Sequence, residues 1–105
     1  MKRYVIDLDH TLCDTKKNDD GSWNYLQALP FSSRIKKINM LAEDGNYIII
    51  ETARGFWTKR NWYMETYNQL VSWGVKFHEL RTGIKYAADY YIDDKAINSE
   101  DFFNE

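Results

Sequence analysis

The sequence lacks the marks of a secreted, membrane-bound or nucleic-acid-binding protein. Its single cysteine, Cys13, cannot form a disulfide within the chain, which favours a reducing compartment. No apolar run is long enough to cross a membrane or to act as a signal, since the first one covers only residues 4–6. Apart from Arg34, Lys36 and Lys37, no basic cluster occurs, and the formal net charge is -2. We therefore expect a cytoplasmic protein with no membrane partner and no nucleic acid as its main partner.

The chain is also short, and it contains no repeats. Its 105 residues suffice for one domain with a modest core, and no linker or low-complexity segment divides them. Aromatic residues are frequent instead, at 16% with 4 Trp and 8 Tyr. Large side chains add apolar area to a small core, and they can also line a substrate surface. The sequence leaves both interpretations open for any single aromatic residue.

Strand-like and helix-like segments alternate along the chain, which predicts right-handed crossovers and a parallel sheet. We expect one Rossmann-like, three-layer α/β domain over residues 1–105. Its small sheet should hold about four strands in the order 4-1-2-3, and it should have no large cap domain. The expected strands are residues 3–8, 47–50, 75–80 and 89–92, and the expected helices are residues 32–44 and 58–74, with a further turn at 84–88.

Polar side chains stand at the ends of these strands. Asp7 and Asp9 end the first strand, Thr52 follows the second, and Asp93-Asp94 follows the last. Ligands of parallel sheets bind at the carboxyl ends of the strands, so we expect these residues to share one site. Like charges held close together raise each other's pKa, and a divalent cation commonly offsets that cost. The sequence therefore predicts an acidic, metal-binding site.

The same site has the groups that phosphoryl transfer needs. A carboxylate can act as a nucleophile and form an acyl phosphate, and a second carboxylate can transfer protons. A hydroxyl and an ammonium group stabilise charge on the transferring phosphoryl group. The candidate catalytic residues that supply these groups are Asp7, Asp9, Thr52 and Lys85.

Four motifs in this order resemble those of the haloacid dehalogenase (HAD) superfamily of phosphatases. They are Asp7-Leu8-Asp9-His10-Thr11, Thr52, Lys85 and Asp93-Asp94. Within the superfamily, the chain is most similar to a small capless group, the capsule-biosynthesis phosphatase-like proteins. That similarity lies in residues 34–39, 47–55, 73–80 and 88–97.

The resemblance implies a role for each catalytic candidate. Asp7 would be the nucleophile that accepts the phosphoryl group. Asp9 would be the general acid and base. Thr52 would hydrogen-bond the phosphoryl group, and Lys85 would neutralise charge on the nucleophile and the phosphate.

The resemblance also implies Mg2+ as the cofactor. Asp7 would contact the ion through its carboxylate, and Asp9 through its backbone carbonyl oxygen. One of Asp93 and Asp94 would bind the ion directly, and we favour Asp93 as that ligand. The other would act through water or through Lys85.

Two residues depart from the family pattern near the reacting atoms. His10 stands where glycine is common, so it lies near the leaving group and is a candidate substrate contact. Lys85 lies in residues 83–86, whose sequence differs from the Gly-Lys-Pro of the family, and Lys76 is a rival for its role.

Other candidates surround the site. Residues 13–30, which carry Trp23 and Tyr25, are either a lid over the site or a solvent-exposed loop. Arg54 is either a contact for a second anionic group of the substrate or part of a surface ion pair. His78, on the expected third strand, is a weaker candidate for a site role.

We therefore expect a Mg2+-dependent phosphomonoester hydrolase with an aspartyl-phosphate intermediate. The resemblance implies a sugar phosphate or related metabolite of surface-polysaccharide synthesis as its substrate. A phosphorylatable signalling domain, a binding module without turnover and a polynucleotide-end phosphatase stay open as alternatives. Phe102-Phe103, near the acidic end of the chain, either pack back on the body or mark a contact surface, and exposed aromatic residues could build a homodimer over the site.

Overall fold

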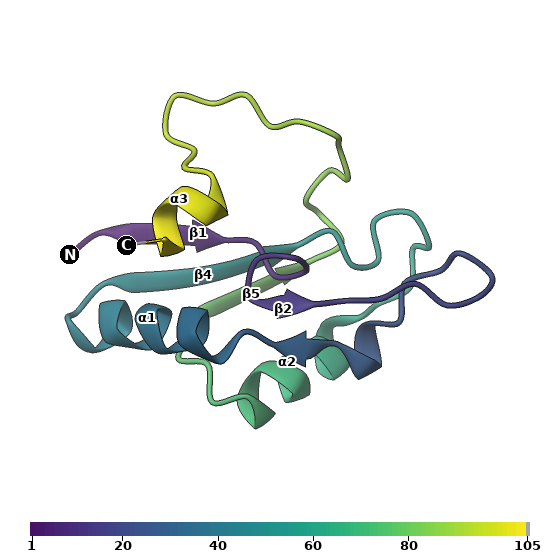
Figure 1. Ribbon diagram of the computed structural model, residues 1–105, viewed down its shortest axis with the longest axis horizontal. Helices are drawn as coiled ribbons and strands as arrows, with labels where there is room; N and C mark the ends of the chain where they lie inside the picture. Colours follow the sequence, from purple (N-terminus) through teal and green to yellow (C-terminus); the bar gives the residue numbers. More distant parts are fainter. Residues whose placement is uncertain (105) are drawn as a thin grey trace.

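A parallel sheet with two long helices forms the body of the protein in this computed structural model, which describes residues 1–104 (Figure 1). The sheet holds β1 (Arg3–Ile6), β4 (Tyr47–Thr52) and β5 (Glu79–Thr82) in the order β1-β4-β5. Both neighbouring pairs of strands are parallel. The expected parallel α/β arrangement without a large cap is therefore confirmed over this part of the chain.

Helices α1 (Ser32–Glu43) and α2 (Tyr63–Ser72) make the two crossovers, and both lie on the same side of the sheet (Figure 1). The first helix agrees with its expected range, whereas the second begins five residues after Thr58, its expected cap. No helix among residues 1–104 has the length and apolar character needed to cross a membrane. The residues that form the core between helices and sheet include Ile6, Leu8, Ile35, Ile38, Ile48, Ile50, Leu70, Val75 and Leu80.

Among residues 1–104, no helix covers the other face of the sheet, where the sequence predicts a second helical layer. Val5, which points to that face, is 62% exposed, and Ile49 beside it is only partly buried. The last helix, α3 (Ser99–Phe103), packs instead against α1 and the Tyr4 side chain of β1. There the ring of Phe102 lies 6.2 Å from that of Tyr4, and a side-chain nitrogen of Arg34 bonds Glu100 at 3.0 Å. Of the two interpretations of Phe102-Phe103, the one in which they pack back on the body is thus confirmed, while the three-layer expectation is not.

The fourth expected strand, residues 89–92, does not form in this structure. The chain instead takes a wide path between β5 and α3 (Figure 1), with Tyr90 84% exposed and Ile92 98% exposed. The expected turn at residues 84–88 is also absent. An apolar run of three residues offers little burial against the entropy lost on ordering the segment. As a result β1 is an edge strand in place of the central position that the order 4-1-2-3 gives it.

The candidate lid is a hairpin-like excursion with some regular structure. Strands β2 (Cys13–Asp14) and β3 (Leu29–Pro30) pair antiparallel at its base. A bridge between Lys17 and Trp23 and the short helix η1 (Tyr25–Gln27) order its outer part. These contacts make residues 13–30 a defined element beside the sheet.

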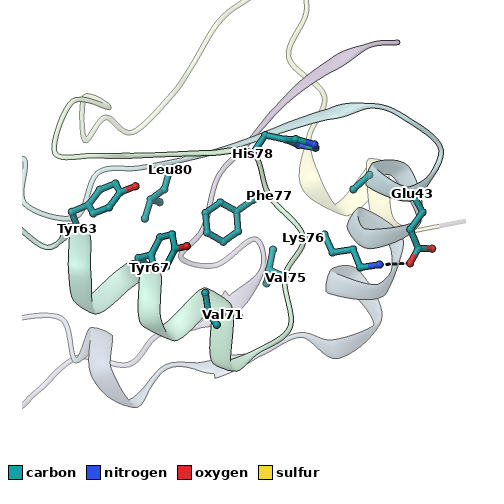
Figure 2. Close-up of a pocket in the computed structure, with 10 residues that line it drawn as sticks. Glu43, Tyr63, Tyr67, Val71, Val75, Lys76, Phe77, His78 and Leu80 are labelled. Carbon is teal, nitrogen blue, oxygen red and sulfur yellow. Dashed lines mark hydrogen bonds and ion pairs between the residues drawn. The ribbon is translucent and has the colours of Figure 1, made fainter.

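A groove of about 610 Å³ lies between α2 and the segment that leads into β5 (Figure 2). Tyr63 and Tyr67 stand along the helix on one side, with Phe77 across from them. The charged side chains at its far end pair with each other, because Lys76 Nζ lies 2.6 Å from a carboxylate oxygen of Glu43. The groove therefore contains no unpaired cluster of catalytic groups, although it is larger than the cleft at the strand ends.

Gly55 is the position after β4 that tolerates a side chain least. Its φ is +90°, and a Cβ there would lie 2.4 Å from the carbonyl oxygen of Arg60. Gly45 has the same φ of +90° but no atom within 4 Å of such a Cβ, so it is a matched control. We expect Gly45→Ala to lower the free energy of unfolding by about 1 kcal/mol through backbone strain alone. Gly55→Ala should lower the free energy of unfolding by at least about 2 kcal/mol more than Gly45→Ala does, as measured by urea unfolding. Equal losses in the two variants would contradict the close approach of residue 55 to the carbonyl oxygen of Arg60.

Candidate active site

A cleft of about 310 Å³ lies at the carboxyl ends of β1 and β4, beside the hairpin of residues 13–30. It brings together all four candidate catalytic residues, both candidate substrate contacts and the two aromatic residues of the candidate lid. The lining residues are Asp7, Asp9, His10, Trp23, Tyr25, Thr52, Ala53, Arg54, Trp57, Lys85, Ala87, Ala88 and Tyr91.

Asp7 carries the partly exposed carboxylate of this cleft. One of its oxygens lies 3.2 Å from Lys85 Nζ, and the other accepts a hydrogen bond of 3.2 Å from the hydroxyl of Thr11. Lys76, the rival lysine, is instead paired with Glu43 in the groove of Figure 2. The lysine beside the candidate nucleophile is thus Lys85.

Asp9 is held by an arginine that the sequence does not mark as its partner. Arg54 donates to both carboxylate oxygens of Asp9, from Nε at 3.0 Å and from a terminal nitrogen at 2.8 Å. The hydroxyl of Thr15 donates to the same carboxylate at 2.6 Å. Such a two-pronged, charge-assisted contact fixes the direction of the carboxylate as well as its charge.

The Arg54 side chain is completely enclosed, with 0% of its surface exposed. Its remaining terminal nitrogen donates to Gln69 at 2.8 Å and to Thr66 at 3.3 Å, and the ring of Tyr25 lies 4.6 Å from its guanidinium carbon. Neither of the two interpretations of Arg54 is correct, because the side chain is closed to a second anionic group of the substrate and its ion pair with Asp9 is buried and not at the surface. Its hydrogen-bonding capacity already serves Asp9 and α2, and a substrate cannot reach it.

The charge of Arg54 decides the protonation state of Asp9. Burial alone would raise the pKa of the Asp9 carboxyl, but the hydrogen bonds and charge of Arg54, with a further bond from Thr15, outweigh it and hold the pKa below its ordinary value. Asp9 is thus ionised at neutral pH. Nearby, burial raises the pKa of the Cys13 thiol to about 11, so this cysteine remains a thiol and a poor nucleophile.

Thr52 and His10 complete the floor and one wall of the cleft. The hydroxyl oxygen of Thr52 accepts the backbone N–H of Arg54 at 3.2 Å, which leaves the hydroxyl proton for a further bond. His10 has a φ of +67°, a left-handed conformation that explains why glycine suits this position. Its ring lies edge-on to Trp23 at 5.1 Å, so His10 connects the strand end to the lid hairpin.

His78 has a structural role at the start of β5. Its Nδ1 accepts the backbone N–H of Ile48 at 3.0 Å, and its ring stacks on Tyr47 at 4.7 Å. It does not line the cleft. The weak site role that the sequence allows for His78 therefore has no support in its position.

The predicted magnesium ligands do not fit the ion as they stand. The ligand expected from Asp9 is its backbone carbonyl oxygen, and the bonds from Arg54 to the Asp9 carboxylate do not involve that atom. Asp93 and Asp94 are exposed and do not line the cleft, and the backbone N–H of Lys95 donates to Asp93 at 2.8 Å. Across residues 1–104, no three acidic, histidine or cysteine side chains come together as a ligand set. Asp7 alone offers a carboxylate to a cation in the cleft.

The sequence did not reveal Thr66 and Gln69, which bind Arg54, or Trp57, which forms one wall of the cleft. Thr66 and Gln69 are three residues apart in α2 and therefore lie on the same face of the helix. The sequence around them does not indicate that this face contacts an arginine. Trp57 carried a signal, since it is an aromatic residue close after Thr52 in a segment rich in polar residues. Its place in the cleft follows from the turn of residues 54–58.

Comparison with known proteins supports the fold and gives no chemistry. No protein-family model matches the chain, and no curated protein matches it in sequence. Among solved structures, the chain is similar to the crystal structure of a structural-genomics target from Vibrio cholerae, with a TM-score of 0.84 and 25% sequence identity. The match covers 100% of this chain and 89% of that chain. A protein of similar size thus has the same small α/β fold.

Loss of the Arg54 side chain should destabilise the protein because it leaves the Asp9 carboxylate buried and unpaired. We expect Arg54→Gln to lower the free energy of unfolding by about 3 kcal/mol at neutral pH. The matched control is Arg60→Gln, since Arg60 pairs with Glu65 at an exposed position and should cost no more than about 1 kcal/mol. Urea unfolding of both variants measures the difference, and equal losses would contradict a stabilising Arg54–Asp9 pair.

The same pair should also make stability depend on acid. The folded-state pKa of Asp9 is below its ordinary value of 3.8. The ionised carboxylate therefore stabilises the folded protein at neutral pH, and this stabilisation is lost as the pH falls from 3.8 to the lower folded-state pKa. In Arg54→Gln this acid-dependent loss should shrink, because the pKa of Asp9 is no longer depressed. An unchanged acid dependence in the variant would show that Asp9 is not the group responsible.

Proposed function

We propose that this protein is a phosphomonoester hydrolase of the HAD type in which Asp7 accepts the phosphoryl group. The observation that carries the proposal is the pairing of Asp7 with Lys85 at 3.2 Å on the floor of a cleft at the strand ends. A carboxylate next to a fixed ammonium group is positioned to attack phosphorus while the cation offsets the charge of the phosphate. Thr52, in the same cleft, adds a hydroxyl donor.

The proposed reaction has two displacements at phosphorus. In the first, an oxygen of Asp7 forms a bond to phosphorus, the bond from phosphorus to the ester oxygen breaks, and the leaving oxygen takes a proton from solvent water. In the second, water attacks the phosphorus of the acyl phosphate, and the bond between phosphorus and Asp7 breaks. Inorganic phosphate leaves, and the Asp7 carboxylate is restored.

Asp9 suits the second displacement better than the first. An ionised carboxylate can take the proton of the attacking water, and Arg54 holds Asp9 in that state. Protonation of the leaving alcohol would require Asp9 to take up a proton first, which the same contact opposes. We therefore propose Asp9 mainly as the base of the hydrolytic step.

We also propose Mg2+ as the cofactor, together with the four-strand, Rossmann-like order. The acidic set is completed if residues 89–94 dock along the free edge of β1, so that Asp93 and Asp94 approach Asp7. Two observations support this: β1 has an unpaired edge, and the apolar residues Tyr90 and Ile92 are almost fully exposed. When bound, the ion would offset the charge gathered around the phosphoryl group.

Replacement of the nucleophile should abolish turnover without unfolding the protein. We expect Asp7→Asn to reduce phosphate release from an aryl phosphomonoester by at least about a thousandfold, because no acyl phosphate can form on residue 7. Asp19→Asn, at an exposed position of the lid hairpin, is the matched control and should retain full activity. Near-normal turnover in Asp7→Asn, with unfolding stability intact, would exclude the proposed mechanism.

Magnesium should order the segment before α3. We expect Mg2+ to slow hydrogen exchange at the backbone amides of residues 90–92, because docking on β1 gives them hydrogen-bond partners. The effect should be lost in Asp93→Asn, and residues 19–21 of the lid hairpin, which are exposed, serve as the internal control. Exchange at residues 90–92 that does not respond to the ion would rule out the docked state.

A further inference from the structure

The lining of the cleft points to one class of substrate. We propose that the alcohol part of the substrate carries an aromatic ring, so that the enzyme acts on aryl or arylalkyl phosphomonoesters in preference to sugar phosphates. This inference rests on the proposed hydrolase function and goes beyond it, because it concerns the part of the substrate that leaves.

Aromatic side chains surround the pair of Asp7 and Lys85. Trp57 lines the cleft while 71% of its surface is exposed, so most of the indole is open to a ligand. Trp23 and Tyr91 line the same cleft, but a lysine ammonium group already lies over each ring, that of Lys17 at 5.0 Å and that of Lys85 at 4.9 Å, so Trp57 carries the stacking argument. Flat rings of this kind bind another aromatic ring by stacking, which is favourable for any ring with an open π-face.

Apart from the enclosed Arg54, the groups of the cleft that could replace the water around sugar hydroxyls belong to its aromatic and histidine side chains or to the four candidate catalytic residues. Its lining contains no asparagine, glutamine, serine or glutamate, and it includes the apolar residues Ala53, Ala87 and Ala88. The polar groups of Asp9 and Arg54 are already bonded to each other. Each hydroxyl that loses water without gaining a new partner weakens binding. A polyhydroxylated alcohol is therefore a poorer fit than an aromatic one.

The residues that line the cleft offer a substrate no second cation. Among its lining residues, the permanent cations are Lys85, which is paired with Asp7, and Arg54, whose side chain is enclosed. A second phosphate or carboxylate on the substrate would thus enter the cleft without a charge partner. We therefore restrict the substrate class to monoesters whose alcohol is uncharged.

Benzyl phosphate and glucose 6-phosphate test this preference directly, because both are esters of primary alcohols and differ mainly in the ring that leaves. We expect kcat/KM for benzyl phosphate to exceed that for glucose 6-phosphate by at least about tenfold. A cyclohexylmethyl ester, which is apolar but not flat, should fall between the two. Equal values, or a preference for the sugar ester, would overturn the aromatic assignment while the hydrolase function stands.

Substitution of Trp57 tests the site itself. Trp57→Leu keeps an apolar side chain and removes the flat ring, so the ratio of kcat/KM for benzyl phosphate to that for glucose 6-phosphate should fall at least about fivefold. Tyr63→Leu removes an exposed ring from the groove of Figure 2, away from the cleft, and should leave the ratio unchanged. An unchanged ratio in Trp57→Leu would contradict the proposal. No phosphate release from any ester or from acetyl phosphate would instead overturn the proposed function.

Discussion

The buried ion pair between Arg54 and Asp9 is the contact on which the rest of the site depends. A guanidinium with no exposed surface is costly unless each side of it finds a partner. Here the partners come from separate parts of the chain: Asp9 from the end of β1, Gln69 from α2, and Tyr25 from the lid hairpin. Gln69 also donates to the backbone carbonyl of Tyr25 at 2.8 Å, which closes the network. One side chain thus fixes the positions of a strand end, a helix and the hairpin of residues 13–30 relative to one another.

The same contact gives Asp9 a cation of its own, so that the neighbouring carboxylates of Asp7 and Asp9 do not share one. Because Arg54 occupies both oxygens of Asp9, the like charge beside Asp7 is already compensated. Asp7 keeps a different cation, Lys85, and remains partly exposed in the cleft. The two acids therefore have different environments, and different environments are how one site assigns different chemical roles to similar groups. This division of roles underlies the proposal that Asp7 is the nucleophile and Asp9 the base.

Local signals in the sequence predicted most of the framework, and the parts that failed depend on long-range contacts. The helix over residues 32–43 follows from the regular spacing of its apolar residues, and Asp7 and Thr52 share a cleft because parallel strands end at the same edge. In contrast, nothing near Arg54 in the sequence indicates that its guanidinium is enclosed, since its partners are distant along the chain. Residues 90–92 carry a strand-like pattern, but a pattern of three residues cannot say whether the segment pairs with β1.

The central claim is that Asp7 forms a covalent bond to phosphorus. Rapid acid quenching during turnover of a phosphomonoester, followed by mass spectrometry of the N-terminal peptide, measures that bond directly. The account predicts a peptide whose mass has increased by one phosphoryl group, with the modification assigned to Asp7 and not to Asp9. Phosphate release at a normal rate with no modified peptide, or with the phosphoryl group on another residue, would contradict it.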